Sequence, residues 1–190
     1  MTVYHRPERF SLPFFAMKLP IESSAMSLFL VLNNLSTVVQ FIEMGGTMMK
    51  VAVLVDTPNI GKSVQNKYTG HARPDYKQLR RMVGKYGLLT KACALVNDGV
   101  NRWFISKLAS EGFEVRLSHA FDCDDALIAW AVRLRQHADC IVLCSGDKHY
   151  IPLVQLLIAT GMTIVVCAVE GCCNGTLRRI AAAYEEMPIK

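Results

Sequence analysis

From Met49 onward, short apolar segments alternate with amphipathic ones. Near-continuous apolar runs rich in branched residues are typical of buried parallel strands, and they occupy residues 50–55, 88–96, 113–118, 139–144 and 162–169. Segments with helical periodicity occupy residues 74–86, 99–111, 124–136, 150–160 and 176–186, whereas residues 57–73 predict a polar loop. We therefore expect an α/β domain with a mainly parallel central sheet of about five strands and helices on both faces.

Residues 1–48 differ from this pattern. The stretch 26–44 is apolar but interrupted by polar residues, so it does not predict a membrane span, which needs about 20 mostly apolar residues. No small-residue cleavage site marks a signal peptide. We expect the domain to begin at Met49, with Met48 or Met49 as the true initiator; the alternative is an accessory amphipathic helix. A peptide from residues 1–40 in the natively expressed protein would exclude the initiator hypothesis.

Composition indicates one ordered, intracellular domain. The chain has 190 residues, of which 52% are hydrophobic and 19% charged, so it can bury a full core and is not a disordered protein. Its seven cysteines lack the paired spacing of a zinc site. An odd number of cysteines without a secretory signal favours a reducing compartment, and we expect a cytoplasmic, bacterial protein with no membrane partner.

The positive charge lies entirely in the domain. The net charge is +5, and residues 49–190 hold 18 Lys and Arg against 13 Asp and Glu. A basic domain suits a polyanionic partner such as RNA, although a soluble basic protein without that function is the alternative.

Acidic residues follow three of the predicted strands. Asp56 ends the first strand, Asp147 follows the fourth, and the acidic residues after the third are Asp122, Asp124 and Asp125. Ligand sites of open α/β sheets form outside the carboxyl ends of the strands, and carboxylates are the ligands that Mg²⁺ and Mn²⁺ prefer. The pattern predicts a site for a divalent cation and a phosphate, to which Asn59 and Ser145 add an amide and a hydroxyl.

Each of these acids also has a purely structural interpretation. Asp56 could form an Asx turn around Pro58, and Asp147 could cap the helix that follows it. Asp124 and Asp125 could cap the helix that they begin. The sequence leaves both interpretations open.

Basic and aromatic residues alternate in the segment from residue 62 to residue 73. Cations with an interleaved aromatic ring can follow a nucleic-acid backbone and stack a base, whereas the alternative is a solvated loop. The residues concerned are Lys62, Lys67, Tyr68, His71 and Arg73.

Two motifs together resemble a known family. Val-Leu-Val-Asp-x-x-Asn at residues 53–59, an acidic helix start, and Leu-Cys-Ser-Gly-Asp-Lys-His-Tyr-Ile-Pro-Leu-Val at residues 143–154 resemble the NYN domains of the PIN-like nuclease superfamily. The LabA-like branch is the most similar, and the resemblance covers residues 49–186. It implies a PIN-like three-layer sandwich and a metal-dependent ribonuclease, with Asp56, Asp124 and Asp147 as ligands of Mg²⁺ or Mn²⁺ and Asn59 beside them.

The chain departs from the family pattern at three positions. The family typically reads Ser-Gly-Asp-x-Asp-Phe-x-Pro-Leu from Ser145, but His149 replaces the second Asp. Thr57 replaces the Gly after the first Asp, and Trp130 stands where a further Asp is often found, although Asp125 could compensate. These changes weaken a second metal position.

The resemblance implies an endoribonuclease, and two other classes remain open. Its catalytic acids would be Asp56, Asp124, Asp125 and Asp147, with His149 as a metal ligand or phosphate contact. A catalytically degenerate module that binds RNA or a protein partner is the main alternative, and a nucleotide phosphohydrolase is a third. The sequence also leaves a homo-oligomer open.

Overall fold

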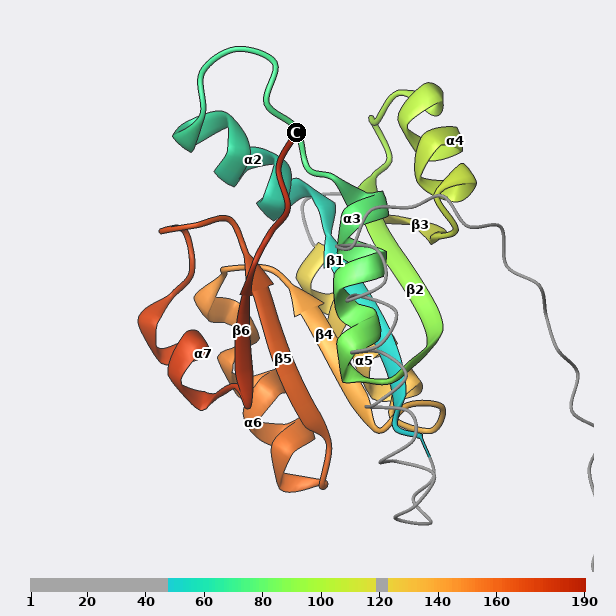
Figure 1. Cartoon of the computed structure of the whole chain (residues 1–190), viewed down its shortest axis with the longest axis vertical. Helices are drawn as coiled ribbons and strands as arrows, with labels where there is room; N and C mark the ends of the chain where they lie inside the picture. The colour runs from blue at the N-terminus through green and yellow to red at the C-terminus, as the bar shows by residue number, and fades with distance from the viewer. Residues whose placement is uncertain (1–47, 119–122) are drawn as a thin grey trace, which may run out of the picture. The chain divides into compact units, whose positions relative to one another are not determined.

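A six-stranded sheet forms the centre of the domain in the computed structural model, which describes residues 48–118 and 123–190 (Figure 1). Every pairing between its neighbouring strands is parallel. The order across the sheet is β3-β2-β1-β4-β5-β6. The strands are β1 (Lys50–Asp56), β2 (Leu88–Asn97), β3 (Glu114–Ser118), β4 (Cys140–Cys144), β5 (Thr163–Ala168) and β6 (Ala183–Glu186).

Helices cover both faces of the sheet, as Figure 1 shows. On one face, α2, α3 and α4 bury Ile60, Leu79 and Leu108; on the other, α5, α6 and α7 bury Leu127, Leu153 and Leu177. The predicted three-layer α/β sandwich is confirmed. The helices are α2 (Thr57–Lys67), α3 (Tyr76–Val83), α4 (Arg102–Ser110), α5 (Cys123–Leu134), α6 (Ile151–Ala159) and α7 (Gly175–Ile180), with 3₁₀ turns η1 (Gly84–Tyr86) and η2 (Lys148–Tyr150).

The direction of strand addition reverses between β1 and β4. The chain adds β2 and β3 on one side of β1, then crosses to add β4, β5 and β6 on the other. β1 and β4 are hydrogen-bonded neighbours, and Val55 pairs with Cys144 at their carboxyl ends. In open α/β sheets, this reversal opens the crevice in which ligands bind. Asp56 and Ser145 follow these two residues and therefore lie at that point.

The prediction of a loop at residues 57–73 was wrong for its first part, where α2 forms. Asp56 caps the helix by accepting a hydrogen bond from the backbone of Asn59, and Pro58 fits the first turn. Ile60 and Val64, four residues apart, are buried against the sheet. The polar composition of the segment concealed this narrow apolar stripe.

The prediction of about five strands was one strand short. The expected helix at residues 176–186 ends at Ile180, and residues 183–186 form β6 beside β5. The expectations for residues 1–47 and for Asp122 fall outside the described residues, so the division near Met49 stays a prediction.

Candidate functional site

Asp56 is a buried carboxylate at the point where the sheet order reverses. Its side chain belongs to a residue that is only 3% exposed, so its charge needs polar partners. The backbone N–H of Asn59 donates to Oδ1 at 3.0 Å, and the hydroxyl groups of Ser145 and Tyr150 donate to Oδ2 at 3.3 Å and 2.9 Å. Asp56 therefore both caps α2 and joins β1 to the segment after β4, so the two interpretations of this residue are compatible.

The segment Ser145-Gly146-Asp147 is fixed by its own backbone groups. The N–H of Asp147 donates to Ser145 Oγ at 3.3 Å, and the N–H of Gly146 donates to Asn59 Oδ1 at 3.1 Å. Asn59 thus holds this segment against α2. A Cβ atom at Gly146 would lie 2.2 Å from the carbonyl oxygen of Cys172, so this position needs a glycine for space.

Asp147 begins the 3₁₀ turn η2 and contacts His149. Its Oδ1 accepts the backbone N–H of His149 at 3.0 Å, and the Nδ1 atom of the His149 ring lies 3.2 Å from the same oxygen. Asp147 is thus a cap, as the structural interpretation predicted, and it also lies beside Ser145 in the site. The imidazole of His149, which replaces the second acid of the family motif, therefore lies beside Asp147, the first acid of that motif.

Tyr150 is a member of the site that the sequence analysis missed. It is fully buried at the end of η2, and its hydroxyl makes the 2.9 Å hydrogen bond to Asp56. The family motif typically has Phe at this position, so the hydroxyl is an addition in this chain. The Tyr in place of Phe was the one feature of the sequence that could have identified this residue.

The acids at the start of α5 stand differently in the structure. Asp125 is exposed, and the side chain of Asp124 lies outside the described part of the chain. Among the residues that the structure describes, no group of three or more His, Cys, Asp and Glu side chains is arranged to hold a metal ion. The Ser145 hydroxyl thus lies between the Asp56 carboxylate and the backbone of Asp147, and a third acid at this site remains a prediction.

Thr57, where the family typically has Gly, has a structural role. It is buried, and its hydroxyl donates to the carbonyl oxygen of Leu95 in β2. This bond ties the first residue of α2 to the neighbouring strand. The hydroxyl that Thr57 brings in place of the family's Gly is thus used in a contact between α2 and β2.

The predicted basic segment is divided between α2 and the chain that follows it. Lys62 is exposed on α2, whereas Lys67 forms an ion pair with Glu170 at 2.6 Å and lies 5.5 Å from the centre of the Tyr68 ring. The hydrogen bond to Glu170 raises the pKa of Lys67. The backbone of Arg73 is paired with Lys190 at the C-terminus. Lys67 is thus partly neutralised, and Lys62, His71 and Arg73 are exposed cations or potential cations on this side.

Asn97 and Asp98 also lie at the carboxyl edge of the sheet. Asn97 is the last residue of β2 and Asp98 the next, and both are exposed. The sequence analysis did not select them, although they lie at the end of a predicted strand as Asp56 does.

No helix among the described residues is long and apolar enough to cross a membrane.

Comparison with known proteins identifies the family. No curated protein matches the chain. A crystal structure of a protein of unknown function from Vibrio parahaemolyticus has the same fold, with a TM-score of 0.67 and 23% sequence identity, over 74% of this chain and 94% of that one. The family model described as "NYN domain" matches residues 50–186. The chain therefore belongs to the NYN domain family, which is part of the PIN-like superfamily.

Proposed function

We propose that this protein is a metal-dependent endoribonuclease whose site is the cluster of Asp56, Ser145 and Asp147. The observation that carries the proposal is the junction of two strand ends. The carboxylate of Asp56, at the end of β1, and the backbone N–H of Asp147, after β4, both contact the Ser145 hydroxyl at the point where the sheet order reverses. Membership of the NYN family suggests a PIN-like nuclease, and NYN domains usually act on RNA.

The two carboxylates have the chemistry of a site for a hard divalent cation. NYN nuclease domains generally depend on a divalent metal, and carboxylate oxygens suit Mg²⁺ and Mn²⁺. Asp56 and Asp147 would hold the ion, with Asp124 as a third ligand. When bound, the ion would lower the pKa of a water molecule and stabilise the charge of the leaving oxygen.

The residues around the carboxylates would orient the substrate. Asn59 and Ser145 fix the two chain segments that carry the acids, so the acids keep their spacing as RNA approaches. His149, beside Asp147, would contact a phosphate oxygen. The exposed Lys62 and Arg73 and the partly buried Tyr68 would guide the RNA backbone, while Lys67 acts mainly through its ion pair with Glu170.

Cleavage of an end-labelled, single-stranded RNA of mixed sequence tests the proposal, with Mn²⁺, with Mg²⁺ and with EDTA. Asp147→Asn should reduce metal-dependent cleavage by about 100-fold or more, because it removes charge where the transition state needs it. The fold should persist, since Asp147 lies at the surface end of η2. Unchanged cleavage by this variant would contradict the assignment.

Asp139→Asn is the matched control. Asp139 accepts a hydrogen bond from the backbone of Lys50, at the amino end of the sheet and away from the site. Its substitution should leave the cleavage rate unchanged. A parallel loss in both variants would indicate a general effect of charge or stability.

A catalytically degenerate RNA-binding module is the second candidate. It is favoured by His149, which stands where the family typically has a second acid. RNA that is bound but not cut under any metal condition would select this function.

A further inference from the structure

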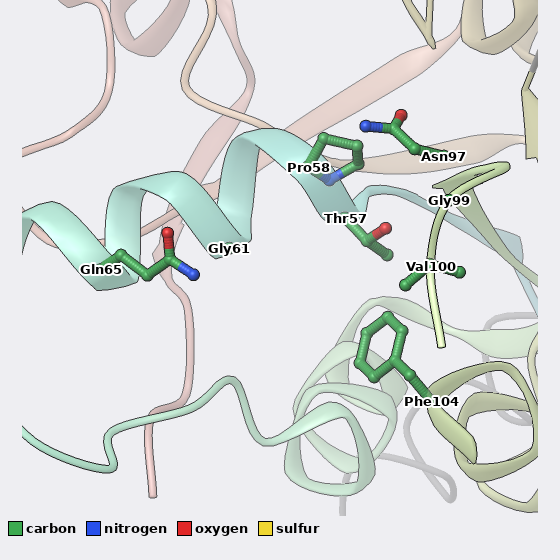
Figure 2. A pocket seen from close by; sticks show the side chains of 8 residues that line it. All are labelled: Thr57, Pro58, Gly61, Gln65, Asn97, Gly99, Val100 and Phe104. Atoms are coloured by element: carbon green, nitrogen blue, oxygen red, sulfur yellow. The ribbon is translucent and has the colours of Figure 1, made fainter. Parts of the chain in front are cut away.

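An open groove lies directly beside the Asp56 site. It has a volume of about 500 Å³ and runs between α2 and the turn that connects β2 to α4. Figure 2 shows the side chains that face it from both walls. The lining residues are Thr57, Pro58, Gly61, Gln65, Asn97, Gly99, Val100 and Phe104.

The groove combines an aromatic surface with amide groups. The Phe104 ring and Val100 lie together at one end, and the Gln65 amide extends from α2 at the other, as Figure 2 shows. Phe104 is held by an edge-on contact with Tyr76, with ring centroids 6.2 Å apart, and it stays partly exposed. Proteins stack unpaired bases on fixed aromatic rings and hydrogen-bond them through polar side chains, and this groove offers both kinds of group.

The groove is rigidly connected to the carboxylate cluster. Thr57 and Pro58, in its wall, are the next two residues after Asp56, and the Thr57 hydroxyl is bonded to Leu95 of β2. A nucleic-acid strand with a phosphate at Asp56 would therefore have a neighbouring base within reach of the groove.

The uncharged lining of the groove suits a base more than a phosphate. None of the lining residues is acidic, and Gly61 and Val100 stand close in sequence to the exposed cations Lys62 and Arg102. Asp98 lies between two lining residues in the turn. The lining itself thus carries no charged side chain.

We propose that this groove binds unpaired bases of the RNA strand beside the scissile phosphate, with Phe104 as a stacking surface at one end and Gln65 as a hydrogen-bonding group at the other. The inference rests on the proposed function for the position of the phosphate. If it is correct, the protein prefers one kind of base, and side chains of α2 and α4 determine that preference.

Binding of short labelled RNA homopolymers in EDTA, measured by fluorescence anisotropy, tests this proposal without requiring cleavage. The wild-type protein should distinguish the four homopolymers. Phe104→Leu, which keeps an apolar contact with Tyr76, should weaken binding of the preferred one by about tenfold or more, because base stacking is lost. Gln65→Ala should reduce the differences among the homopolymers.

Each variant has a neighbouring control. Trp103→Leu removes an aromatic ring that is 63% exposed on α4 but does not line the groove, and Asn66→Ala removes an exposed amide from α2. Both should bind RNA as the wild type does. The proposal is overturned if wild-type protein binds no homopolymer, if the groove variants bind as tightly and selectively as wild type, or if only Trp103→Leu weakens binding.

Failure of this inference is distinguishable from failure of the proposed function. If the protein binds RNA through the groove but never cuts it, the proposed base site is supported and the proposed nuclease activity is contradicted. If the protein cuts RNA in a way that depends on Asp147, but Phe104→Leu and Gln65→Ala bind RNA as the wild type does, the nuclease activity is supported and the base site is contradicted.

Discussion

The hydroxyl group of Tyr150 donates a hydrogen bond to the carboxylate of Asp56, the last residue of β1. The bond joins residues that are 94 apart in sequence and closes a network with Ser145 and Asn59. Buried hydrogen bonds to a charged group contribute more to stability than those between neutral groups. The hydroxyl therefore stabilises the site as well as the core around it.

Tyr150→Phe should lower the free energy of unfolding by about 1–3 kcal/mol, because Asp56 loses a buried donor and the ring stays in place. Urea unfolding measures the change. Tyr184→Phe is the control, since its hydroxyl lies 3.5 Å from the carbonyl oxygen of Ala168 and should contribute less. Equal losses in both variants would contradict a special role for the bond to Asp56.

At the residue scale, the sequence located the acids better than their partners. The positions of Asp56 and Asp147 could be predicted because each comes after a buried apolar run. A residue at the end of such a strand lies at the carboxyl edge of the sheet. The role of the Tyr150 hydroxyl could not be predicted, because it depends on the 3₁₀ turn η2, which precedes the contact between Tyr150 and Asp56. The groove at Phe104 could not either, since it forms between two helices that are far apart in sequence.

At the scale of elements, tertiary pairing overrode local preference at the end of the chain. Three consecutive alanines favour a helix, but the last of them, Ala183, begins β6, which pairs with β5. Glu185 of β6 accepts hydrogen bonds from Lys85 and Tyr86 of η1. Burial alone would raise the pKa of Glu185, but these bonds outweigh it and hold the pKa below its ordinary value.

Because its pKa is lowered in the folded state, Glu185 should stabilise the protein above its ordinary pKa, and this contribution should disappear as the pH falls through the lowered value. Glu185→Gln should therefore lower Tm at neutral pH, and its difference from wild type should shrink below about pH 4. Thermal unfolding across this range checks the expectation, with the exposed Glu186→Gln as control. A difference that stays constant with pH would contradict it.

At the scale of the whole domain, the C-terminal residues connect β6 to the segment before α3. Figure 1 shows the C-terminus beside this connection. Arg73 and Lys190 exchange two backbone hydrogen bonds of 2.9 Å, and the N–H of Asp75 donates to the carbonyl of Pro188 at 2.8 Å. Lys190 Nζ also lies 3.0 Å from Asp75. The last residues thus tie together segments from both ends of the domain.

Deletion of residues 188–190 should lower the free energy of unfolding by about 1–2 kcal/mol, because the lost hydrogen bonds are only partly offset by regained chain entropy. Urea unfolding measures this change. Lys190→Met keeps the backbone bonds and should cost less than about 1 kcal/mol, as expected for a surface ion pair. A larger effect of the point substitution than of the deletion would contradict this account.

The position of β1 in the sheet has a consequence for synthesis on the ribosome. β1 lies between β2 and β4, so a nascent chain that has made only its first three strands leaves one edge of β1 without its partner. Unpaired apolar edges recruit other chains and promote aggregation. The Ser145–Asp56 bond spans 89 residues and forms only after β4 has emerged. The same docking step therefore hides the edge from other nascent chains and completes the site.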